Sequence, residues 1–513
     1  MHRCLSVVEI VDMICFDLDT YSPRSRAALA VLARTSSIFK EPALNALWRR
    51  QSSLAPLLRC MPKDLFDLET PMPKSPTYQL KRPIVATDWD IFRSYALRIK
   101  EFRLSVFNRM KGILSSLGAC IHGGFLFPNL TALHLHCSLK AFEFSVINIF
   151  ISPKLSELTF YARSSLNILS SLSTLASVCR GLTHLKLDFT PHGTEVDHCM
   201  SLFICSLPCI QVITLDGIDA AGLVHLGRLS TLTSLTVASL PSTLPATSMS
   251  NPMFVHLQHL DVTVDELGLA TQFLLMCSGL PLKSLAVLFT SLTSDIEIET
   301  FYHAVHARCS HTTLHSLTIK NPDESNKGSL MSGSVLRILS PFRNLTSLNV
   351  LAAVGFDLND AMIVTLAAMW PRMETFVLES AVFVIEPELT LQCLESLAQC
   401  WPNLKRLQIE FNATQTPVPR VGARHPVQRQ LVSIDVGYST VASPVRVARF
   451  LSGIFPNLDS ITTAREGDDN DNEDDEDEVE AFEIAHHKRW KEVEAFIPEF
   501  VVAREEERTS APS

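Results

Sequence analysis

His134, His136 and Cys137 are the residues of this 513-residue chain whose types and spacing come nearest to a metal site. Imidazole nitrogen and thiolate sulfur are ligands that zinc prefers, and four ligands usually surround the ion. Both histidines alternate with leucines, so they are expected on one face of a strand, whereas Cys137 faces the other way. A zinc site needs further ligands nearby, and we predict no bound metal here.

Motifs for other chemistry are absent from the sequence. It contains no H-E-x-x-H, G-x-S-x-G, Walker A or dinucleotide-binding glycine motif. Glycine is scarce, with 18 residues, which argues against loops that cradle phosphate through backbone amides. We therefore predict a protein that needs no cofactor and is not itself an enzyme.

Charge and hydropathy exclude further classes of function. Ten acids between Glu466 and Glu478 account for the net charge of −10, so the rest of the chain is neutral and lacks the basic surface of a nucleic-acid-binding protein. No apolar run reaches the roughly 18 residues of a membrane span, and Glu9, Asp12 and Asp17 interrupt any apolar core of a signal peptide. The 13 cysteines contain no C-x-x-C pair and are interpreted as reduced thiols. We expect a cytoplasmic and/or nuclear protein that binds neither nucleic acid nor membrane.

The elements that position any functional residue come from a repeated pattern. The motif L-x-x-L-x-L starts thirteen times from residue 130 onward, at an average spacing of about 27 residues. Its last two leucines are two residues apart, which is the period of a strand with one buried face. The stretches between motifs have helical spacing, and a strand–helix unit cannot bury its apolar face alone, so the units are expected to stack. The clearest copies start at Leu130, Leu182, Leu314, Leu345 and Leu404.

These repeats resemble the leucine-rich-repeat family, of its longer helix-backed subtype, over roughly residues 120–465. The resemblance implies an α/β fold, a leucine-rich-repeat solenoid with a concave parallel sheet and outer helices. The solenoid is expected to span 87–465. Its first segment, 87–117, has apolar residues such as Trp89 and Phe102 at helical spacing, and we predict that it forms a helix that caps the first repeat.

The N-terminus, residues 1–61, follows a different pattern. Apolar residues recur there at helical spacing in short stretches, which predicts a small all-α module. The string from His2 to Trp48 resembles the F-box motif, with Val8 at the place of that family's proline. The resemblance implies that the module binds a Skp-type adaptor and, through it, a cullin.

The adaptor contact is assigned to the first and last helices of this module. Apolar residues of the first helix cover more than one stripe, which argues that two surfaces are buried, one of them by a partner. The alternative is that some of them fill the core of the module itself. The predicted contact residues are Val7, Val8, Ile10, Val11, Ile14, Leu44, Leu47 and Trp48.

Two further segments join or follow these domains. Residues 62–86 are rich in proline and are predicted to form an extended linker. Residues 466–513 begin with the acidic run, for which a disordered spacer is favoured over a surface that attracts a basic partner. A helical stripe that includes Trp490 and is broken by Pro498 follows, and it could dock on the last repeat or bind a partner.

The solvent-facing positions of the predicted strands form the candidate surface for a target. Residues two, four and six positions after the first leucine of a motif face the concave side, among them Glu379, Gln408 and Asp435. Acids outnumber lysine plus arginine by seven to three on this face, so it suits a protein target better than a phosphate backbone. The residues assigned to target binding are His134, His136, Glu157, Tyr161, His184, Lys186, Asp188, His259, Asp261, Lys320, Arg406 and Glu410.

Together, the two resemblances imply the substrate-recognition subunit of a Skp–cullin–F-box ubiquitin ligase. Such a subunit holds an unidentified protein target and contributes proximity rather than chemistry. One alternative is a non-ligase leucine-rich-repeat scaffold with a degenerate F-box, which Val8 favours. Another is an enzyme, which would need a deep pocket with converging titratable groups where the repeats predict an open surface.

Overall fold

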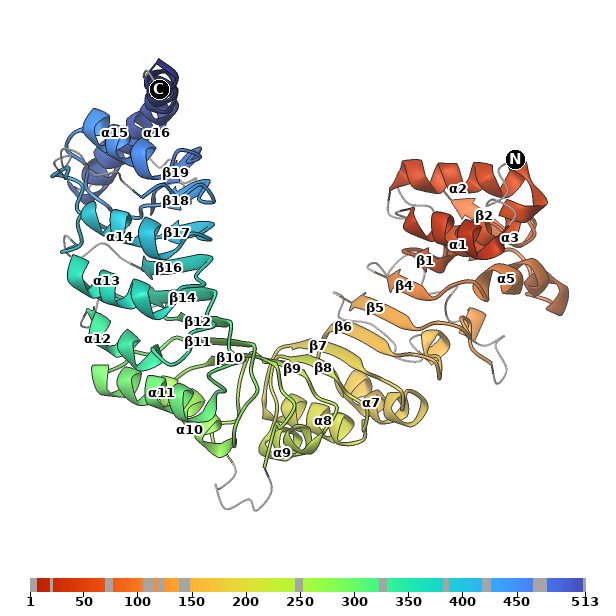
Figure 1. Ribbon diagram of the computed structural model, residues 1–513. Coiled ribbons are helices and arrows are strands. Elements are labelled where there is room, and N and C mark those ends of the chain that lie inside the picture. Colours follow the sequence, from red (N-terminus) through yellow and green to blue (C-terminus); the bar gives the residue numbers. More distant parts are fainter. Residues whose placement is uncertain are drawn as a thin grey trace. The chain divides into compact units, whose positions relative to one another are not determined.

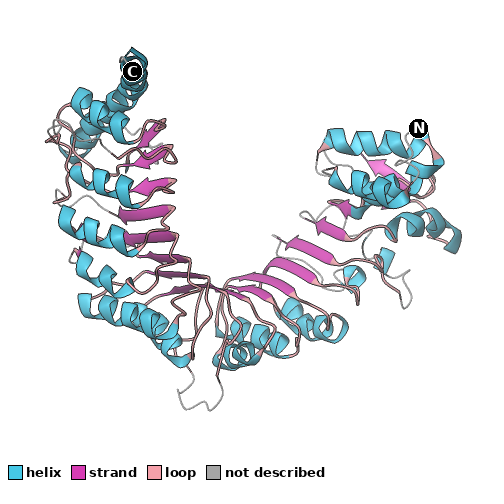
Figure 2. Cartoon of the chain, viewed as in Figure 1, coloured by secondary structure: helices cyan, strands magenta, loops and turns pink. Residues whose placement is uncertain are grey.

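The computed structural model divides the chain into two compact units, Met1–Val237 and Ala238–Ser513 (Figure 1). Among the described residues, fifteen strands form the two long parallel arrays, seven in the first unit and eight in the second, so the predicted α/β class with a parallel sheet is confirmed. In each unit the helices between the strands cover one face and leave the other open (Figure 2). The structure describes residues 7–18, 22–69, 77–104, 114, 116–118, 124–137, 148–244, 252–322, 330–381, 387–417, 426–464 and 478–510.

Three helices begin the first unit, namely α1 (Val8–Asp17), α2 (Pro23–Thr35) and α3 (Ser37–Arg49). Proline opens α2, and Ser36 caps α3 by accepting a hydrogen bond from the backbone N–H of Ile38. Because the core that they enclose is small, much of the apolar surface of α1 stays outside it. The buried core residues are Val11, Cys15, Leu29, Ala43 and Ala46.

The proline-rich segment after this module folds back on itself. β2 (Phe66–Glu69) pairs antiparallel with β3 (Thr77–Leu80), so the predicted extended linker contains a hairpin. The Arg82 guanidinium then binds the carboxylates of Asp64 and Asp88, at 2.7 Å in each case. Its hydrogen bonds to Asp88 hold the pKa of that buried carboxyl below its usual range.

The predicted helix over 87–117 is wrong as one continuous helix, because a strand interrupts it. α5 (Trp89–Ala96) ends after eight residues, and the chain enters β4 (Glu101–Leu104), which pairs in parallel with β1 (Arg50–Gln51). Over so short a stretch, the apolar spacing that includes Phe102 fits a strand as well as a helix. The strand pairing decides between them, and most of the remaining predicted helix lies outside the described residues.

The seven strands of the first unit pair in the order β1-β4-β5-β6-β7-β8-β9. The further elements of this unit are α4 (Ala55–Leu58), β5 (Ala132–Cys137), β6 (Glu157–Arg163), α7 (Leu166–Val178), β7 (His184–Thr190), α8 (Thr194–Cys205), β8 (Val212–Leu215), α9 (Ala220–Arg228) and β9 (Ser234–Val237). From β4 onward, the register aligns one buried apolar residue of each strand in a row across the sheet. From β5 onward, the residue in this row is the one at the second leucine position of the L-x-x-L-x-L motif. The row consists of Phe102, Leu133, Leu158, Leu185, Ile213 and Leu235.

The eight strands of the second unit pair in the order β10-β11-β12-β14-β16-β17-β18-β19, and β13 pairs separately with β15. The elements are β10 (His259–Val264), α10 (Leu267–Met276), β11 (Ser284–Phe289), α11 (Asp295–Arg308), β12 (Ser316–Lys320), β13 (Met331–Ser332), α12 (Gly333–Leu336), β14 (Ser347–Ala352), β15 (Phe356–Asp357), α13 (Asp360–Met369), β16 (Thr375–Ser380), α14 (Gln392–Cys400), β17 (Arg406–Gln408), β18 (Ser433–Asp435), α15 (Pro444–Ile454) and β19 (Ser460–Thr462). An equivalent buried row crosses this sheet: Leu260, Leu285, Leu317, Leu348, Phe376, Leu407, Ile434 and Ile461.

Two tryptophans end helices of the second unit, each directly before a proline. Trp370 follows α13 and Trp401 follows α14, and both rings are fully buried. The indole N–H of Trp370 donates to the carbonyl of Leu339 at 3.3 Å, and that of Trp401 donates to the carbonyl of Ala367 at 3.1 Å. Each ring therefore connects one strand–helix unit to the preceding one.

A long helix, α16 (Glu478–Ser510), ends the described chain and packs on α15. Trp490 is fully buried, and its indole N–H donates to the carbonyl of Ser439 at 2.8 Å. The helix therefore packs on the last strand–helix units of the same chain, which is one of the two predicted alternatives. The predicted break at Pro498 is wrong, because the helix continues through this exposed residue. The acidic run before α16 lies outside the described residues except for Glu478.

Side chains of α16 also bond to the last strand, β19. The carboxylate of Glu494 accepts from the backbone N–H of Ile461 at 2.6 Å, and the ammonium of Lys491 donates to the carbonyl of Ile461 at 2.9 Å.

None of the described helices, α16 included, has both the length and the apolar character that crossing a membrane requires.

Candidate functional site

The open face of the first unit carries the predicted target-binding residues of β5, β6 and β7. All seven side chains are exposed or half-buried, as the alternation along these strands predicts. The strand register arranges them in three rows. The rows are Glu157 with His184, His134 with Lys186, and His136 with Tyr161 and Asp188.

Tyr161 is the centre of a small contact group on this face. The His136 ring meets the Tyr161 ring edge-on, with 5.7 Å between centroids. The ammonium of Lys186 lies 5.3 Å from the centroid of the same ring, within the range of a cation–π contact. The side chains of His136, Tyr161 and Lys186 therefore contact one another across β5, β6 and β7.

His134 lies in a cluster of charged side chains. Its Nε2 is 3.8 Å from the carboxylate of Glu101, which also binds Arg50 at 2.9 Å and Arg103 at 2.8 Å. Burial, and then the charge of Arg103, lowers the pKa of His134. The side chain of Cys137 is outside the described residues, and among those described no three His, Cys, Asp or Glu side chains are placed to hold a metal ion.

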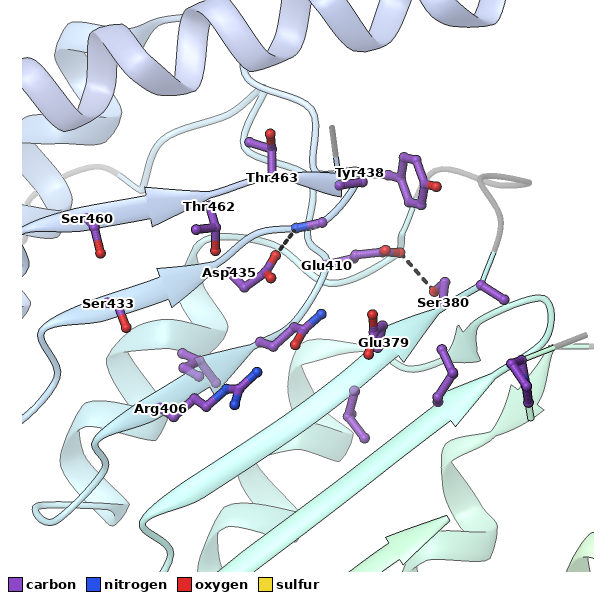
Figure 3. A pocket seen from close by; sticks show the side chains of 18 residues that line it. Glu379, Ser380, Arg406, Glu410, Ser433, Asp435, Tyr438, Ser460, Thr462 and Thr463 are labelled. Carbon is purple, nitrogen blue, oxygen red and sulfur yellow. Dashed lines mark hydrogen bonds between the residues drawn. The ribbon is translucent and has the colours of Figure 1, made fainter. Parts of the chain in front are cut away.

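The second unit carries a cavity of about 780 Å³, which opens on the face that the helices leave free (Figure 3). Its walls come from β14, β16, β17, β18 and β19, from segments that follow these strands, and from Pro322 after β12. The volume is within the range of ligand-binding sites. Its polar lining consists of Glu379, Ser380, Arg406, Gln408, Glu410, Ser433, Asp435, Tyr438, Ser460, Thr462 and Thr463.

Glu410, just after β17, is held in the cavity by two neighbouring segments (Figure 3). Its carboxylate accepts a hydrogen bond from the Ser380 hydroxyl at 3.0 Å and another from the backbone N–H of Tyr438. Gly437 makes room for it, with φ of +51°, because a Cβ at this position would lie 2.7 Å from a Glu410 carboxylate oxygen. Glycine is therefore required at position 437 both for its backbone conformation and for the fit of Glu410.

The lining carries three carboxyl groups, those of Glu379, Glu410 and Asp435, and one guanidinium, that of Arg406. Asp435 accepts a hydrogen bond from the backbone N–H of Gly437 at 2.9 Å. Burial, with the charges of Asp435 and Glu379 added, raises the pKa of Glu410 to about 7. The cavity is therefore acidic and contains one carboxyl that titrates near neutral pH.

The cavity separates the predicted target-binding residues of the second unit. Arg406 and Glu410 line it, whereas His259 and Asp261 lie on β10 and Lys320 lies on β12. The open strand face is therefore hollowed at this place, with the carboxyl groups of Glu379, Glu410 and Asp435 spread along the lining.

Sequence reasoning did not single out several residues of this site, among them Ser380, Gly437 and Tyr438. These three come at or after the ends of strands, where the alternation between buried and open positions no longer applies. The glycine directly after a predicted strand is the one signal that could have indicated a special turn there.

The outer surface of α1 carries part of the predicted adaptor contact. Val7, Val8 and Ile14 are exposed, and Ile10 is half-buried. Val11 instead belongs to the core of the module, as the alternative in the sequence analysis allowed, so it is not available to a partner.

The remaining predicted adaptor residues are half-buried on α3. Leu44 is partly exposed, and Leu47 packs against the core of the module. Trp48 stacks on Tyr95, with 4.5 Å between ring centroids. These side chains therefore support the module as well as contributing to its surface.

Two exposed residues of α1 were not predicted. Met13 is 61% exposed, and Phe16 is exposed with its ring 4.4 Å from the guanidinium carbon of Arg49. Both lie within the apolar string that suggested the helix, and their spacing of three could have placed them on one surface.

Glu410→Gln is expected to stabilise the second unit by about 1–2 kcal/mol at pH 8 and to change it little at pH 4. Because the pKa of Glu410 is raised to about 7, above its value in the unfolded chain, the wild type loses stability as the pH rises from about 4.3, the ordinary pKa of glutamate, to about 7, and loses no more from this group above that pH. The effect stays below that of full burial, because part of the side chain is exposed. Urea denaturation between pH 4 and pH 8 measures it, and equal stabilisation at both ends would contradict the assignment.

The fold and its surfaces define an α/β protein of serial strand–helix units, with an apolar first helix and an acidic cavity. No protein-family model matches the sequence, and no curated protein matches it. The function therefore has to be inferred from α1, the open strand faces and the cavity.

Proposed function

We propose that this protein is the substrate-recognition subunit of a Skp–cullin–F-box ubiquitin ligase. The observation that carries the proposal is the surface of α1, a helix of ten residues on which Val8, Met13, Ile14 and Phe16 are all exposed. Four exposed large apolar side chains on so short a helix are typical of a contact with another protein. It lies in the segment that resembles an F-box, so a Skp-type adaptor is the proposed partner and a cullin follows through it.

In this proposal the parallel strands and their helices are a leucine-rich-repeat solenoid, preceded by an F-box-like module. The aligned leucines support it, because each strand contributes one buried residue to the same row in each unit. Repeated units of this kind expose long polar strand faces, and such faces commonly bind proteins.

The receptor itself performs no chemistry. The target is held on the open strand faces, while the adaptor and cullin bring a conjugating enzyme near. Tethering raises the effective concentration of a target lysine at the transfer site. The proposed place of action is the cytoplasm, the nucleus or both.

Changing Ile10 and Ile14 to aspartate is expected to abolish co-purification of the adaptor and the cullin. Two charges in a desolvated apolar contact should weaken binding by about a hundredfold or more. The measurement is affinity purification of the full chain with mass spectrometry, beside a chain that lacks residues 1–61.

Because Ile10 is half-buried, a second double variant separates binding from folding. Val8→Asp with Ile14→Asp alters only exposed side chains, and it should lose the adaptor while its helical circular dichroism stays the same. Ile296→Asp, on the exposed face of α11, is the matched control and should retain the adaptor. Undiminished capture by either double variant would refute the assignment of α1.

The scaffold alternative rests on Val8, which stands where the F-box family has proline. It predicts that proteins bind the open strand faces but that neither adaptor nor cullin co-purifies with the full chain. The same purification therefore decides between the two functions.

A further inference from the structure

The cavity of the second unit has an excess of negative charge. Glu379, Glu410 and Asp435 come from three successive strand segments, and Arg406 is the one basic residue among the described lining. With all groups ionised, the lining carries two more negative than positive charges. Like charges brought together in this way favour a ligand that supplies positive charge.

Gln408 provides an independent indication that a ligand belongs here. It lines the cavity and is only 8% exposed, and none of the described residues forms a hydrogen bond with its side-chain amide. In the sheet it lies between Val377 and Asp435. Its amide atoms still reach the space of the cavity, because they are not among the fully buried polar atoms without a partner, and a ligand that enters the cavity can therefore bond to them.

The hydrogen-bond acceptors of the cavity come from several strands, and this arrangement determines which kind of cation can bind. Among the described residues no three acidic, histidine or cysteine side chains converge closely enough for a metal ion. A ligand must therefore reach acceptors on several strands with several N–H donors. Ammonium and guanidinium groups on long aliphatic stems have this property.

We propose that this cavity binds a lysine or arginine side chain of the target protein, an inference that rests on the proposed receptor function. The cation contacts the carboxylates of Glu410 and Asp435 and the amide oxygen of Gln408, and its stem lies along the apolar part of the lining. The bound side chain is an anchor and not a ubiquitin acceptor, because the cavity encloses it.

Binding of the cation is coupled to ionisation of Glu410. The charged and titratable groups around Glu410 are Asp435, Glu379 and Arg406, with His487 of α16 bonded to a threonine at the lining. A cation stabilises the ionised carboxylate, so its binding releases a proton. Since the pKa of Glu410 is about 7, the affinity should rise about tenfold from pH 6 to pH 8.

The test titrates the full chain with acetylated and amidated pentapeptides that carry one central residue between glycine and serine. Saturation-transfer NMR or calorimetry measures the affinity at pH 6 and pH 8. Lysine and arginine peptides are expected to bind at least tenfold more tightly at pH 8 than peptides with Nε-acetyllysine, norleucine or glutamate.

Variants of the chain locate the binding. Glu410→Gln should weaken the lysine peptide about tenfold and remove the dependence on pH, whereas Glu374→Gln, which alters a carboxylate paired with Lys405 outside the cavity, should change neither. Gln408→Leu should weaken binding about threefold to tenfold without lowering the melting temperature. A residue with a purely structural role would lower the melting temperature instead.

Three results would overturn the proposal: equal binding of the acetyllysine peptide, preference for the glutamate peptide, or no binding of cationic peptides at millimolar concentration by the folded chain. Failure here is distinguishable from failure of the receptor function, because Glu410→Gln leaves α1 intact and should still capture the adaptor. Peptide binding without adaptor capture would refute the receptor function alone.

Discussion

Replacing Trp490 with alanine is expected to detach α16 and to lower the free energy of unfolding of the second unit by about 3–5 kcal/mol. The ring is fully buried, meets Phe411 edge-on with 5.9 Å between centroids and donates to the carbonyl of Ser439. Alanine would leave a cavity and a carbonyl without its donor. Urea denaturation measures the loss, and limited trypsin digestion should cut α16 faster.

Two variants control this experiment. Trp490→Phe keeps most of the ring volume and should lose about 1 kcal/mol, mainly for the missing hydrogen bond. Glu492→Ala changes an exposed residue of the same helix and should behave as the wild type. If Trp490→Ala is digested no faster than Glu492→Ala, then α16 does not depend on this contact.

Gln428→Leu is expected to destabilise the second unit by about 3 kcal/mol. The Gln428 amide is buried and donates to the carbonyls of Leu404, at 2.6 Å, and Pro402, at 3.3 Å. Its oxygen accepts from the backbone N–H groups of Gln430, at 3.0 Å, and Leu431, at 2.9 Å. Leucine fills the same space but leaves these backbone groups without partners, and thermal denaturation measures the result.

The matched control for this prediction is Gln430→Leu, which alters an exposed glutamine in the same segment and should cost little. Gln428→Glu keeps the acceptor, so it should be less harmful at low pH than at neutral pH, where it introduces a buried charge. A Gln428→Leu protein as stable as Gln430→Leu would show that the four bonds contribute nothing net.

Local periodicity was sufficient to predict many of the parallel strands and most of their buried rows, although it placed β4 in a helix. The motif at Leu314, for example, predicts β12, and Leu317 indeed lies in the buried row of the second unit. Trp370 and Trp401 end helices directly before proline, a residue that stops a helix through its local chemistry. Such signals are local, so they survive without knowledge of the neighbouring units.

The cavity could not be predicted, because it depends on contacts between segments far apart in the sequence. Alternation placed Gln408 and Asp435 on the same face, but their convergence with Ser380 is set by strand register. The room for Glu410 depends on the positive φ of Gly437. For α1, the sequence indicated two apolar surfaces but could not tell which one the module buries.

The bonds from Lys491 and Glu494 to Ile461 have a consequence for the behaviour of the protein at high concentration. The outer edge of a terminal strand offers unpaired N–H and C=O groups, through which a second molecule can extend the sheet into a polymer. Here both groups of Ile461 are already occupied by side chains of the same chain. The final helix thus blocks end-to-end growth at this edge, and its removal should favour aggregation.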